Sequence, residues 1–391
     1  MSLFHIDPCD LLVVRDGRPK ADASVGQSLT FPYPPTVAGG VRTRVGSLPG
    51  RGFVAGAQLD ALKRVAIRGP LLSALSGEGG VMFPAPRDAL LVKDAEGVES
   101  LKRLTPLDDM GDAVGDVIDG LKPVGLRREQ HAAAKPVSAG AWWSWRLTEA
   151  WLRGESLNLA GDDWASGRLG ALVTEGRLHV ALGAGGTNVD GALFETRGLR
   201  LTRSAGAAHQ PLSVASYALL VDVDDATLPA GMTLRDEVAP FGGERKLMRW
   251  SKATGVTLPP APEWLKRHVT DGAGCDVRVV LATPGHFAAG ARPAPEGALL
   301  RGGDGLTVTL TAMAVGRPDG FSGWDFAAPK GGRPKPSERV VSAGSVFWLR
   351  LMGSAAEREK WLARVWMQNV SDAAERRCDG LGLALVGKGD A

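Results

Sequence analysis

The chain has 391 residues, of which 44% are hydrophobic and 23% are charged, and 52 are glycine. These values predict two or three globular domains and exclude a chain that is disordered throughout. No stretch reaches the roughly 20 consecutive apolar residues of a membrane span, and residues 1–16 lack the features of a signal peptide. We therefore expect a cytoplasmic protein without a membrane partner.

The charge and the cysteine content of the chain exclude few classes of function. There are 46 Lys and Arg residues against 43 Asp and Glu, and this net charge of +3 is too small by itself to indicate nucleic-acid binding. The three cysteines, Cys9, Cys275 and Cys378, lie far apart, so their spacing predicts neither a disulfide framework nor a zinc site.

The first predicted element in chain order is a strand over residues 11–14, which ends at an arginine-containing turn over 15–19. A short helix is predicted over 37–45, and Thr36 is expected to cap its N-terminus. Residues from about 53 to 165 show no sustained periodicity. We interpret them as a large insertion in the first domain.

Strands are predicted again after this insertion. Residues 169–174 and 178–182 form two short apolar runs with a turn between them at Glu175-Gly176. A glycine-rich tip at 183–187 then leads into a strand over 192–201. The first domain is expected to end at residue 210.

The second half of the chain has clearer patterns. Ser354 is the expected N-cap of the best helix, and Glu357 is its capping-box partner. Apolar side chains follow one face of that helix, namely Trp361, Leu362, Val365, Trp366 and Val370. A shorter helix is predicted at 262–269, and strands are predicted at 216–222, 276–282, 306–315, 345–351 and 381–386. The order strand, helix, strand, strand, helix, strand, with one additional strand, predicts a ferredoxin-like domain over 211–391.

A search for catalytic chemistry finds little. The sequence has no P-loop, no zinc-protease helix and no nucleophile elbow, and its histidines show no metal-binding spacing. His5 is a candidate general base for RNA cleavage, although a structural histidine is the more frequent case. The carboxylates Asp222, Asp224 and Asp225 end a strand, where a solvated turn explains them without a metal. We predict no catalytic residue, metal or cofactor.

Four glycine-rich turns, most of them with arginines, remain as candidates for binding phosphate. Glycine admits a close backbone approach, helix N-terminal N–H groups attract anions, and Arg pairs with phosphate. The predicted RNA-binding residues are Arg15, Arg18, Thr36, Gly39, Gly40, Arg42, Thr43, Arg44, Gly242, Gly243, Arg245, Lys246, Gly380 and Gly382. We expect Arg15, Arg18, Arg42 and Arg44 to share one surface, and the terminal glycine loop at 379–383 to lie at a surface.

The order of these turns resembles the RAMP superfamily, and within it the third subunits of type III-B (Cmr) CRISPR effector complexes. The residues that carry the resemblance are Arg15-Asp16-Gly17-Arg18-Pro19, Pro34-Pro35-Thr36-Val37-Ala38-Gly39-Gly40-Val41-Arg42-Thr43, Phe241-Gly242-Gly243-Glu244-Arg245, Gly323-Trp324-Asp325, Ala343-Gly344-Ser345-Val346-Phe347 and Gly380-Leu381-Gly382. They extend over nearly the whole chain.

The resemblance implies an α+β fold with two ferredoxin-like (RRM-like) RAMP domains, of which the first, 1–210, carries the insertion at 53–165. It also implies a non-catalytic subunit that holds the 5′ repeat-derived tag of the crRNA. Its implied partners are the crRNA, the large polymerase/cyclase-like subunit, a neighbouring backbone RAMP subunit and, indirectly, the target RNA.

Other interpretations remain open at this point. The chain is also compatible with the tag-binding RAMP subunit of a type III-A complex, with a RAMP ribonuclease that processes precursor crRNA, and with a metabolic enzyme that has a glycine-rich nucleotide site. A cluster of tryptophans, Trp142, Trp143, Trp145 and Trp151, fits one amphipathic helix that packs in the insertion better than it fits a stacking surface.

Overall fold

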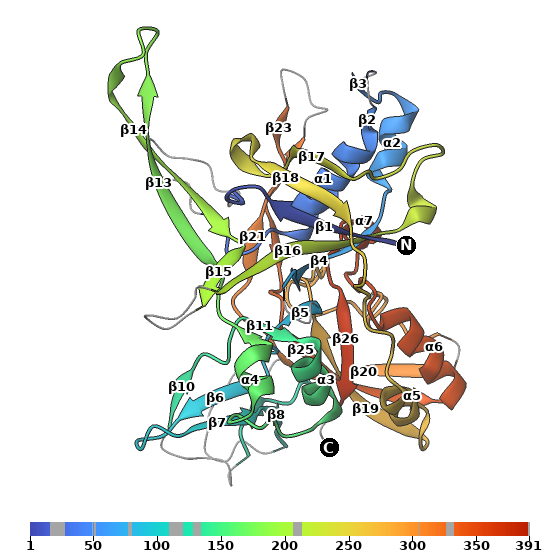
Figure 1. Cartoon of the computed structure of the whole chain (residues 1–391). Helices are drawn as coiled ribbons and strands as arrows, with labels where there is room; N and C mark the ends of the chain where they lie inside the picture. Colours follow the sequence, from blue (N-terminus) through green and yellow to red (C-terminus); the bar gives the residue numbers. More distant parts are fainter. Residues whose placement is uncertain are drawn as a thin grey trace.

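A computed structural model describes residues 1–15, 28–48, 50, 52–76, 80–108, 120–127, 134–205, 213–303, 305–325 and 332–389. Sheets and helices occur in both halves of the chain (Figure 1), which confirms the predicted mixed α and β class. In the described ranges, no helix is long and apolar enough to cross a membrane.

The larger sheet has the strand order β12-β11-β5-β4-β16-β1-β18-β17, and β15 pairs with β16 beside this path. Its strands are β1 Ser2–Pro8, β4 Ile67–Ala74, β5 Gly80–Pro84, β11 Trp142–Ser144, β12 Arg168–Leu169, β15 Thr202–Ala205, β16 Ser213–Val223, β17 Glu237–Pro240 and β18 Leu247–Lys252. Helix α1, Pro34–Gly46, packs on one face of this sheet.

Strand β16 lies at the centre of the larger sheet and is buried on both faces. Leu219 and Val221 belong to the core that includes α1, whereas Leu220 belongs to the core shared with the second half of the chain. Successive side chains of a strand point to opposite faces of a sheet. The apolar side chains of β16 therefore pack alternately into two different cores.

This position of β16 corrects the expected organisation. The strand predicted at 216–222 exists, but it pairs with β1 and β4 in the larger sheet and not with strands of the second domain. Similarly, β4 lies within the range 53–165 that we interpreted as an insertion, yet it is an inner strand of the same sheet. Local periodicity identifies a buried strand without saying which sheet receives it.

The smaller sheet is antiparallel, with the order β20-β25-β19-β26. Its strands are β19 Gly274–Leu281, β20 Leu306–Ala314, β25 Val346–Gly353 and β26 Ala384–Lys388, and the helices α5 Glu263–Thr270 and α6 Ala355–Val365 pack with it. Each of these elements was predicted, although β26 begins three residues later than expected because residues 379–382 form a turn and Leu383 forms only an isolated bridge.

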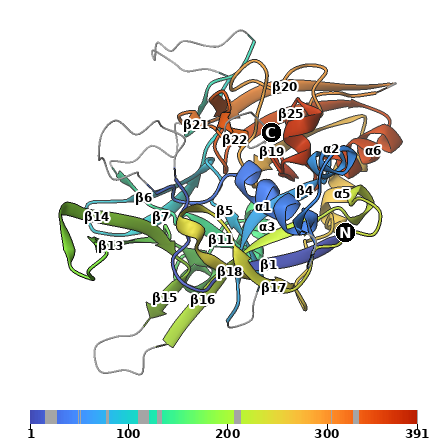
Figure 2. The same ribbon diagram turned by 90° about the horizontal axis from the view of Figure 1, so that it is seen from above.

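The remaining elements are short or peripheral. They are β2 Ser47–Leu48, β3 Gly52–Phe53, α2 Ala57–Lys63, β6 Ala89–Lys93, β7 Glu99–Arg103, β8 Thr105–Pro106, β9 Val124–Gly125, β10 Lys135–Val137, α3 Trp145–Arg153, α4 Asp162–Gly167, β13 Val173–Leu182, β14 Asn188–Arg200, β21 Asp319–Phe321, β22 Trp324–Asp325, β23 Arg333–Pro334, β24 Glu338–Val340 and α7 Ala374–Cys378. Seen from above, the hairpin of β13 and β14 extends away from both sheets (Figure 2).

Several local predictions for the first half were wrong. Residues 11–14 are buried but form only an isolated bridge, between Leu12 and Leu199, and the first strand is β1. Strand β13 continues through Glu175-Gly176, where a turn was expected, while the tip at 183–187 does close the hairpin. Trp142, Trp143 and Trp151 are buried and Trp145 is partly buried, which agrees with a packing role, but they lie on strand β11 and helix α3 and not on one helix.

Helix α6 begins as the sequence predicts, since the Ser354 hydroxyl accepts a hydrogen bond from the Glu357 N–H at 3.3 Å. We expect Ser354→Ala to lower the free energy of unfolding by about 1 kcal/mol, because an N–H of the first turn loses its partner. Ser354→Asp is the control, since aspartate also caps helices and should retain nearly all of the stability. Urea denaturation measures both, and equal losses in the two variants would contradict the capping role.

Candidate nucleic-acid interface

The first and third glycine-rich turns lie together in the structure. The Gly243 N–H donates to the Val13 carbonyl at 2.7 Å, and the Arg15 guanidinium pairs with the Glu244 carboxylate. Gly242 has a φ of +76°, and a Cβ there would lie 2.5 Å from the Val13 oxygen, so glycine is required. Arg245 is exposed beside this junction, and Lys246 pairs with Asp10 at 3.0 Å. Arg18 lies outside the described residues.

Helix α1 does not offer the anion site that the sequence suggested. It begins at Pro34 and not at residue 37, and its N-cap is Tyr33, so Thr36 is inside the first turn and does not cap the helix. Pro34 and Pro35 have no N–H groups, and the Thr36 N–H already donates to the Tyr33 carbonyl. Free N–H donors are therefore not available at the first turn.

The two glycines of α1 serve different purposes. A Cβ at Gly40 would lie 2.6 Å from the Phe241 ring, so this glycine allows the helix to pack against the third turn. A Cβ at Gly39 would meet nothing within 4 Å, and both Gly39 and Thr36 are exposed. The Thr43 hydroxyl donates to the Gly39 carbonyl at 2.7 Å, which is a contact within the helix.

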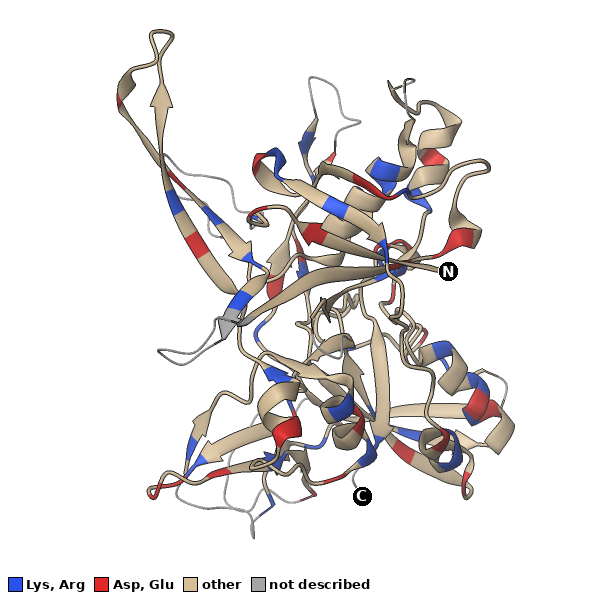
Figure 3. Ribbon diagram, viewed as in Figure 1, with Lys and Arg blue, Asp and Glu red and all other residues tan. Residues whose placement is uncertain are grey.

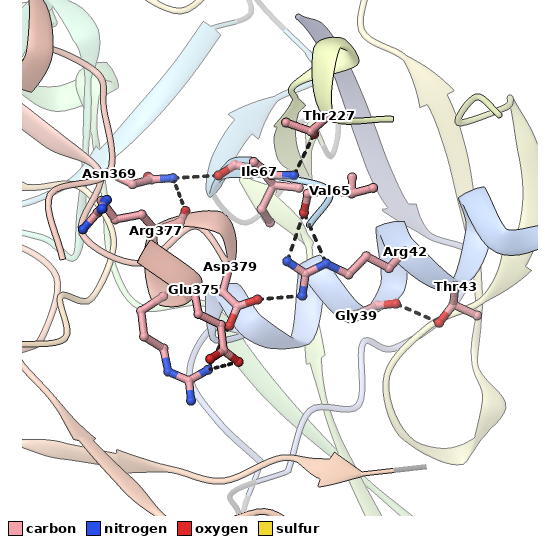
Figure 4. A network of polar contacts seen from close by, with 12 residues as sticks. Gly39, Arg42, Thr43, Val65, Ile67, Thr227, Asn369, Glu375, Arg377 and Asp379 are labelled. Carbon is pink, nitrogen blue, oxygen red and sulfur yellow. Dashed lines mark hydrogen bonds and ion pairs between the residues drawn. The ribbon is translucent and has the colours of Figure 1, made fainter. Parts of the chain in front are cut away.

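Arg42 connects the two halves of the chain (Figure 4). Its guanidinium donates to the Val65 carbonyl at 3.0 and 3.2 Å and to the Asp379 carboxylate at 2.7 Å. The Arg42 side chain is 19% exposed and that of Asp379 is 7% exposed. Beside this pair, the Asn369 amide donates to the Ile67 carbonyl at 2.7 Å. The second glycine-rich turn therefore lies next to the fourth.

Arg42 and Arg44 do not share a surface. Residues two positions apart in an α-helix are rotated by about 200° around its axis, so these side chains leave α1 in nearly opposite directions. Arg44 pairs with Glu237 of β17 at 3.0 Å, while Arg42 points towards α7. The expectation of one common arginine face is wrong for this pair, because each guanidinium is directed to a carboxylate on a different side of the helix.

The terminal glycine loop is buried, which corrects its expected place at a surface. Gly380 has a φ of +91°, and a Cβ there would lie 2.5 Å from the Gly69 carbonyl of β4. Gly382 has a φ of +86°, and a Cβ there would lie 2.8 Å from the Ser371 nitrogen. Gly380 thus permits the second half of the chain to pack closely on the first, whereas Gly382 permits a close approach within the second half.

A cavity of about 730 Å³ opens between the two sheets, beside the start of α1. The residues that line it include four aromatic side chains, from the loop before α1, from β11 and from β21, together with one arginine and one aspartate: Phe31, Tyr33, Trp142, Phe321, Arg87 and Asp319. Phe31 and Trp142 have ring centroids 4.6 Å apart. Both halves of the chain thus contribute residues to this cavity, which we call the interdomain cleft.

Polar groups of the cleft are suited to bind a base as well as a phosphate. Arg87 is exposed, and its guanidinium donates to the Ser342 hydroxyl at 2.8 Å. Burial raises the pKa of Asp319, and the Arg87 charge only partly offsets this rise. Aromatic faces stack on bases, Arg binds phosphate, and a carboxylate accepts from base amino groups.

The aromatic side chains of this cleft come from three segments that lie more than 100 positions apart, so no local pattern predicts that they meet. Only the segment Phe31-Pro32-Tyr33-Pro34-Pro35 offered a local signal, since aromatic residues between prolines are held in an extended chain.

No catalytic group emerges from the described residues. His5 contacts the Ser73 hydroxyl at 3.1 Å, and burial lowers the pKa of the His5 imidazole. Asp222 pairs with Arg68, and Asp225 pairs with the N-terminal amine at 2.6 Å. In the part of the chain that the structure describes, no cluster of three or more His, Cys, Asp or Glu side chains is arranged to hold a metal.

Comparisons with known proteins identify the class. Residues 4–389 match the sequence model of a family of CRISPR-associated proteins. The chain belongs to this family, described as CRISPR-associated protein (Cas_Cmr3), and the predicted family is thereby confirmed. A comparison with curated proteins found no match.

Several solved structures contain chains similar to this one, among them the following two. One is in the cryo-EM structure of the Type III-B Cmr-beta bound to cognate target RNA and AMPPnP, state 1, with 13% identity and a TM-score of 0.44. The other is in the structure of the Type III-B Cmr-beta bound to cognate target RNA, with 13% identity and a TM-score of 0.42. Each alignment covers 88% of this chain and 86% of the other.

The Arg42 network leads to a stability prediction. Arg42→Ala should lower the free energy of unfolding by about 2 kcal/mol, because it leaves the largely buried Asp379 carboxylate with fewer partners. Arg146→Ala is the matched control, since Arg146 pairs with Asp163 but is 78% exposed, and its loss should stay within about 0.5 kcal/mol. Urea denaturation of both variants tests this, and a loss for Arg42→Ala no larger than the control would contradict it.

Proposed function

We propose that the chain is a non-catalytic, crRNA-binding subunit of a type III-B (Cmr) complex, and that the interdomain cleft holds the 5′ repeat-derived tag. Membership of the Cas_Cmr3 family supports the assignment to such a complex. The observation that carries the location is the cleft itself, which presents the partly exposed rings of Phe31 and Tyr33 together with Arg87 along one opening.

The topology supports two ferredoxin-like units, with boundaries that differ from those we first expected. In the first unit, α1 connects β1 to β4, and β16 lies between these two strands in the sheet. Strand β18 pairs with the other edge of β1. In the second, β19, β20, β25, α6 and β26 give the sheet order β26-β19-β25-β20. Both arrangements match a split βαβ unit with one helix replaced by irregular chain.

This topology changes the proposed boundaries of the two units. The first unit ends after β18, near residue 252, and receives an insertion between β4 and β16, at about 75–212. The second unit then begins near α5. The cleft lies between these units, where RNA contacts both of them.

A single-stranded tag is held in such a cleft by stacking and by phosphate contacts. Bases of single-stranded RNA stack on aromatic side chains, and each stack contributes about 1–3 kcal/mol. Phe31 and Tyr33 precede α1 and supply ring faces, while Arg87 supplies a cation. Arg15 and Arg245 have exposed side chains near the third turn and are proposed as additional phosphate contacts.

The same complex supplies the proposed protein partners, which are the large polymerase/cyclase-like subunit and a neighbouring backbone RAMP subunit. The match to the Cas_Cmr3 family favours the type III-B assignment over the tag-binding subunit of a type III-A complex. A RAMP ribonuclease is disfavoured by His5, because this half-buried imidazole contacts a serine within the larger sheet.

Two substitutions test the cleft. Phe31→Leu keeps an apolar side chain but removes the stacking face, so it should weaken binding of tag RNA about 5- to 150-fold, the equivalent of one stack. Arg87→Ala should weaken binding and reduce the salt slope by about one unit. Fluorescence anisotropy measures both effects, with Arg146→Ala as the control that removes a cation outside the cleft. Unchanged affinity in both cleft variants would place the RNA elsewhere.

The proposal also predicts that the purified chain does not cleave RNA. Incubation with repeat RNA, with and without divalent metal, should leave the substrate intact, and His5→Ala should behave like the wild-type chain. Cleavage that His5→Ala abolishes would support the ribonuclease alternative instead.

A further inference from the structure

Tyr33 and Phe321 meet in a small apolar cluster at the interdomain cleft. Phe321 of β21 is 8% exposed, and its ring centroid lies 5.8 Å from that of the half-buried Tyr33. Val340 of β24 and Leu381 of the terminal glycine loop complete this cluster, which is separate from the large cores of the two sheets. Phe321 thus supports the Tyr33 ring from within the protein.

The strand that carries Phe321 has little support of its own. Strands β21 and β24 have three residues each and pair as a two-stranded sheet, and such small hairpins have marginal stability in water. Beyond one end of β24, Val341 exchanges two backbone hydrogen bonds of 2.8 Å with Gly285. At the other end, Glu338 pairs directly across from Phe321. A contact that fixes Glu338 therefore also fixes Phe321.

Arg376 of α7 supplies such a contact. Its guanidinium donates to both oxygens of the Glu338 carboxylate, from Nε at 2.8 Å and from Nη2, while Nη1 donates to Asp379 at 3.0 Å. The guanidinium carbon also lies 5.8 Å from the centroid of the Phe321 ring. His286 approaches the same Glu338 carboxylate, with Nε2 at 3.2 Å. The planar fork of arginine binds one carboxylate through two nitrogens and reaches a second carboxylate with the third, which a lysine ammonium does not reproduce.

These contacts keep Arg376 away from a direct role in binding phosphate. Its side chain is 16% exposed, and all three guanidinium nitrogens already donate to carboxylates. Basic and acidic residues alternate along the described ribbon, and neither sign dominates one side of it (Figure 3). Without a broad basic face in the described residues, affinity for RNA depends more on stacking in the cleft. The orientation of the Tyr33 ring is therefore important.

We propose that Arg376 is a positioning residue of the interdomain cleft: it holds Phe321 in place, and Phe321 keeps the Tyr33 ring in the orientation that stacks on a base of the RNA. This inference rests on the proposed function, which places the RNA tag in the cleft. Arg376 itself does not touch the RNA. The same strand brings Asp319 to the cleft, so the anchor orients a polar group as well.

The test compares variants of the full-length chain by their binding of fluorescent tag RNA at several salt concentrations. Tyr33→Leu removes the stacking ring, Arg376→Gln removes the ion pair with Glu338, and a third variant combines both changes. Arg68→Gln is the matched control, since Arg68 is 18% exposed and pairs with Asp222 but does not line the cleft. The melting temperature of each variant is recorded beside its RNA affinity.

We expect Arg376→Gln to weaken RNA binding by about fivefold or more and to leave the salt dependence unchanged. The double variant should bind no more weakly than Tyr33→Leu alone, because the two side chains act through one stack. Glu338→Gln should repeat the pattern of Arg376→Gln, so the result does not depend on the folding of one variant. Arg68→Gln should lower the melting temperature by a similar amount while its RNA affinity changes less than about twofold.

A purely structural role of Arg376 predicts different results. The losses from Arg376→Gln and Tyr33→Leu would then multiply in the double variant, or Arg68→Gln would weaken RNA binding as much as Arg376→Gln does. Either result would overturn the inference, as would a salt slope lowered by about one unit, which indicates a direct phosphate contact. If Tyr33→Leu weakens binding but Arg376→Gln and Glu338→Gln do not, only this inference fails. If Tyr33→Leu also leaves the affinity unchanged, the location of the tag in the cleft fails as well.

Discussion

The contact between the two halves of the chain is the constraint on which the rest of the structure depends. Arg42 of α1 pairs with Asp379, and Gly380 lies so close to β4 that no side chain fits there. Leu71, Phe83 and Leu220 of the larger sheet enter the same core as the smaller sheet. The contact between the two halves holds the walls of the interdomain cleft in place, so a ligand in the cleft contacts a preformed site.

Several glycines and arginines of the ordered turns make contacts within the protein, where the sequence predicted contacts with RNA. Gly242 and Gly382 permit close approaches within the protein, and Arg42 and Arg44 pair with carboxylates. A sequence motif with Gly and Arg is compatible with phosphate binding and with tight packing alike. Only the positions of Asp379 and Glu237, far away in sequence, distinguish these two roles.

Local signals predicted the second half of the chain well. The Ser354 cap and the alternation of side chains in β25 depend on neighbouring residues, so they are visible in the sequence. The assignment of β16 to a sheet depends on pairing with β1, more than 200 residues earlier, and no local pattern records this pairing. The cleft has no local pattern for the same reason, since Tyr33 and Phe321 come into contact only after folding.

The central claim is that the cleft binds RNA, and photocrosslinking tests this claim directly. A crRNA with 4-thiouridine at a single tag position, assembled with the full-length chain and irradiated, should crosslink to peptides containing residues 28–34 or 318–322. Crosslinks that map only to other segments, such as the hairpin at 173–200, would contradict the account.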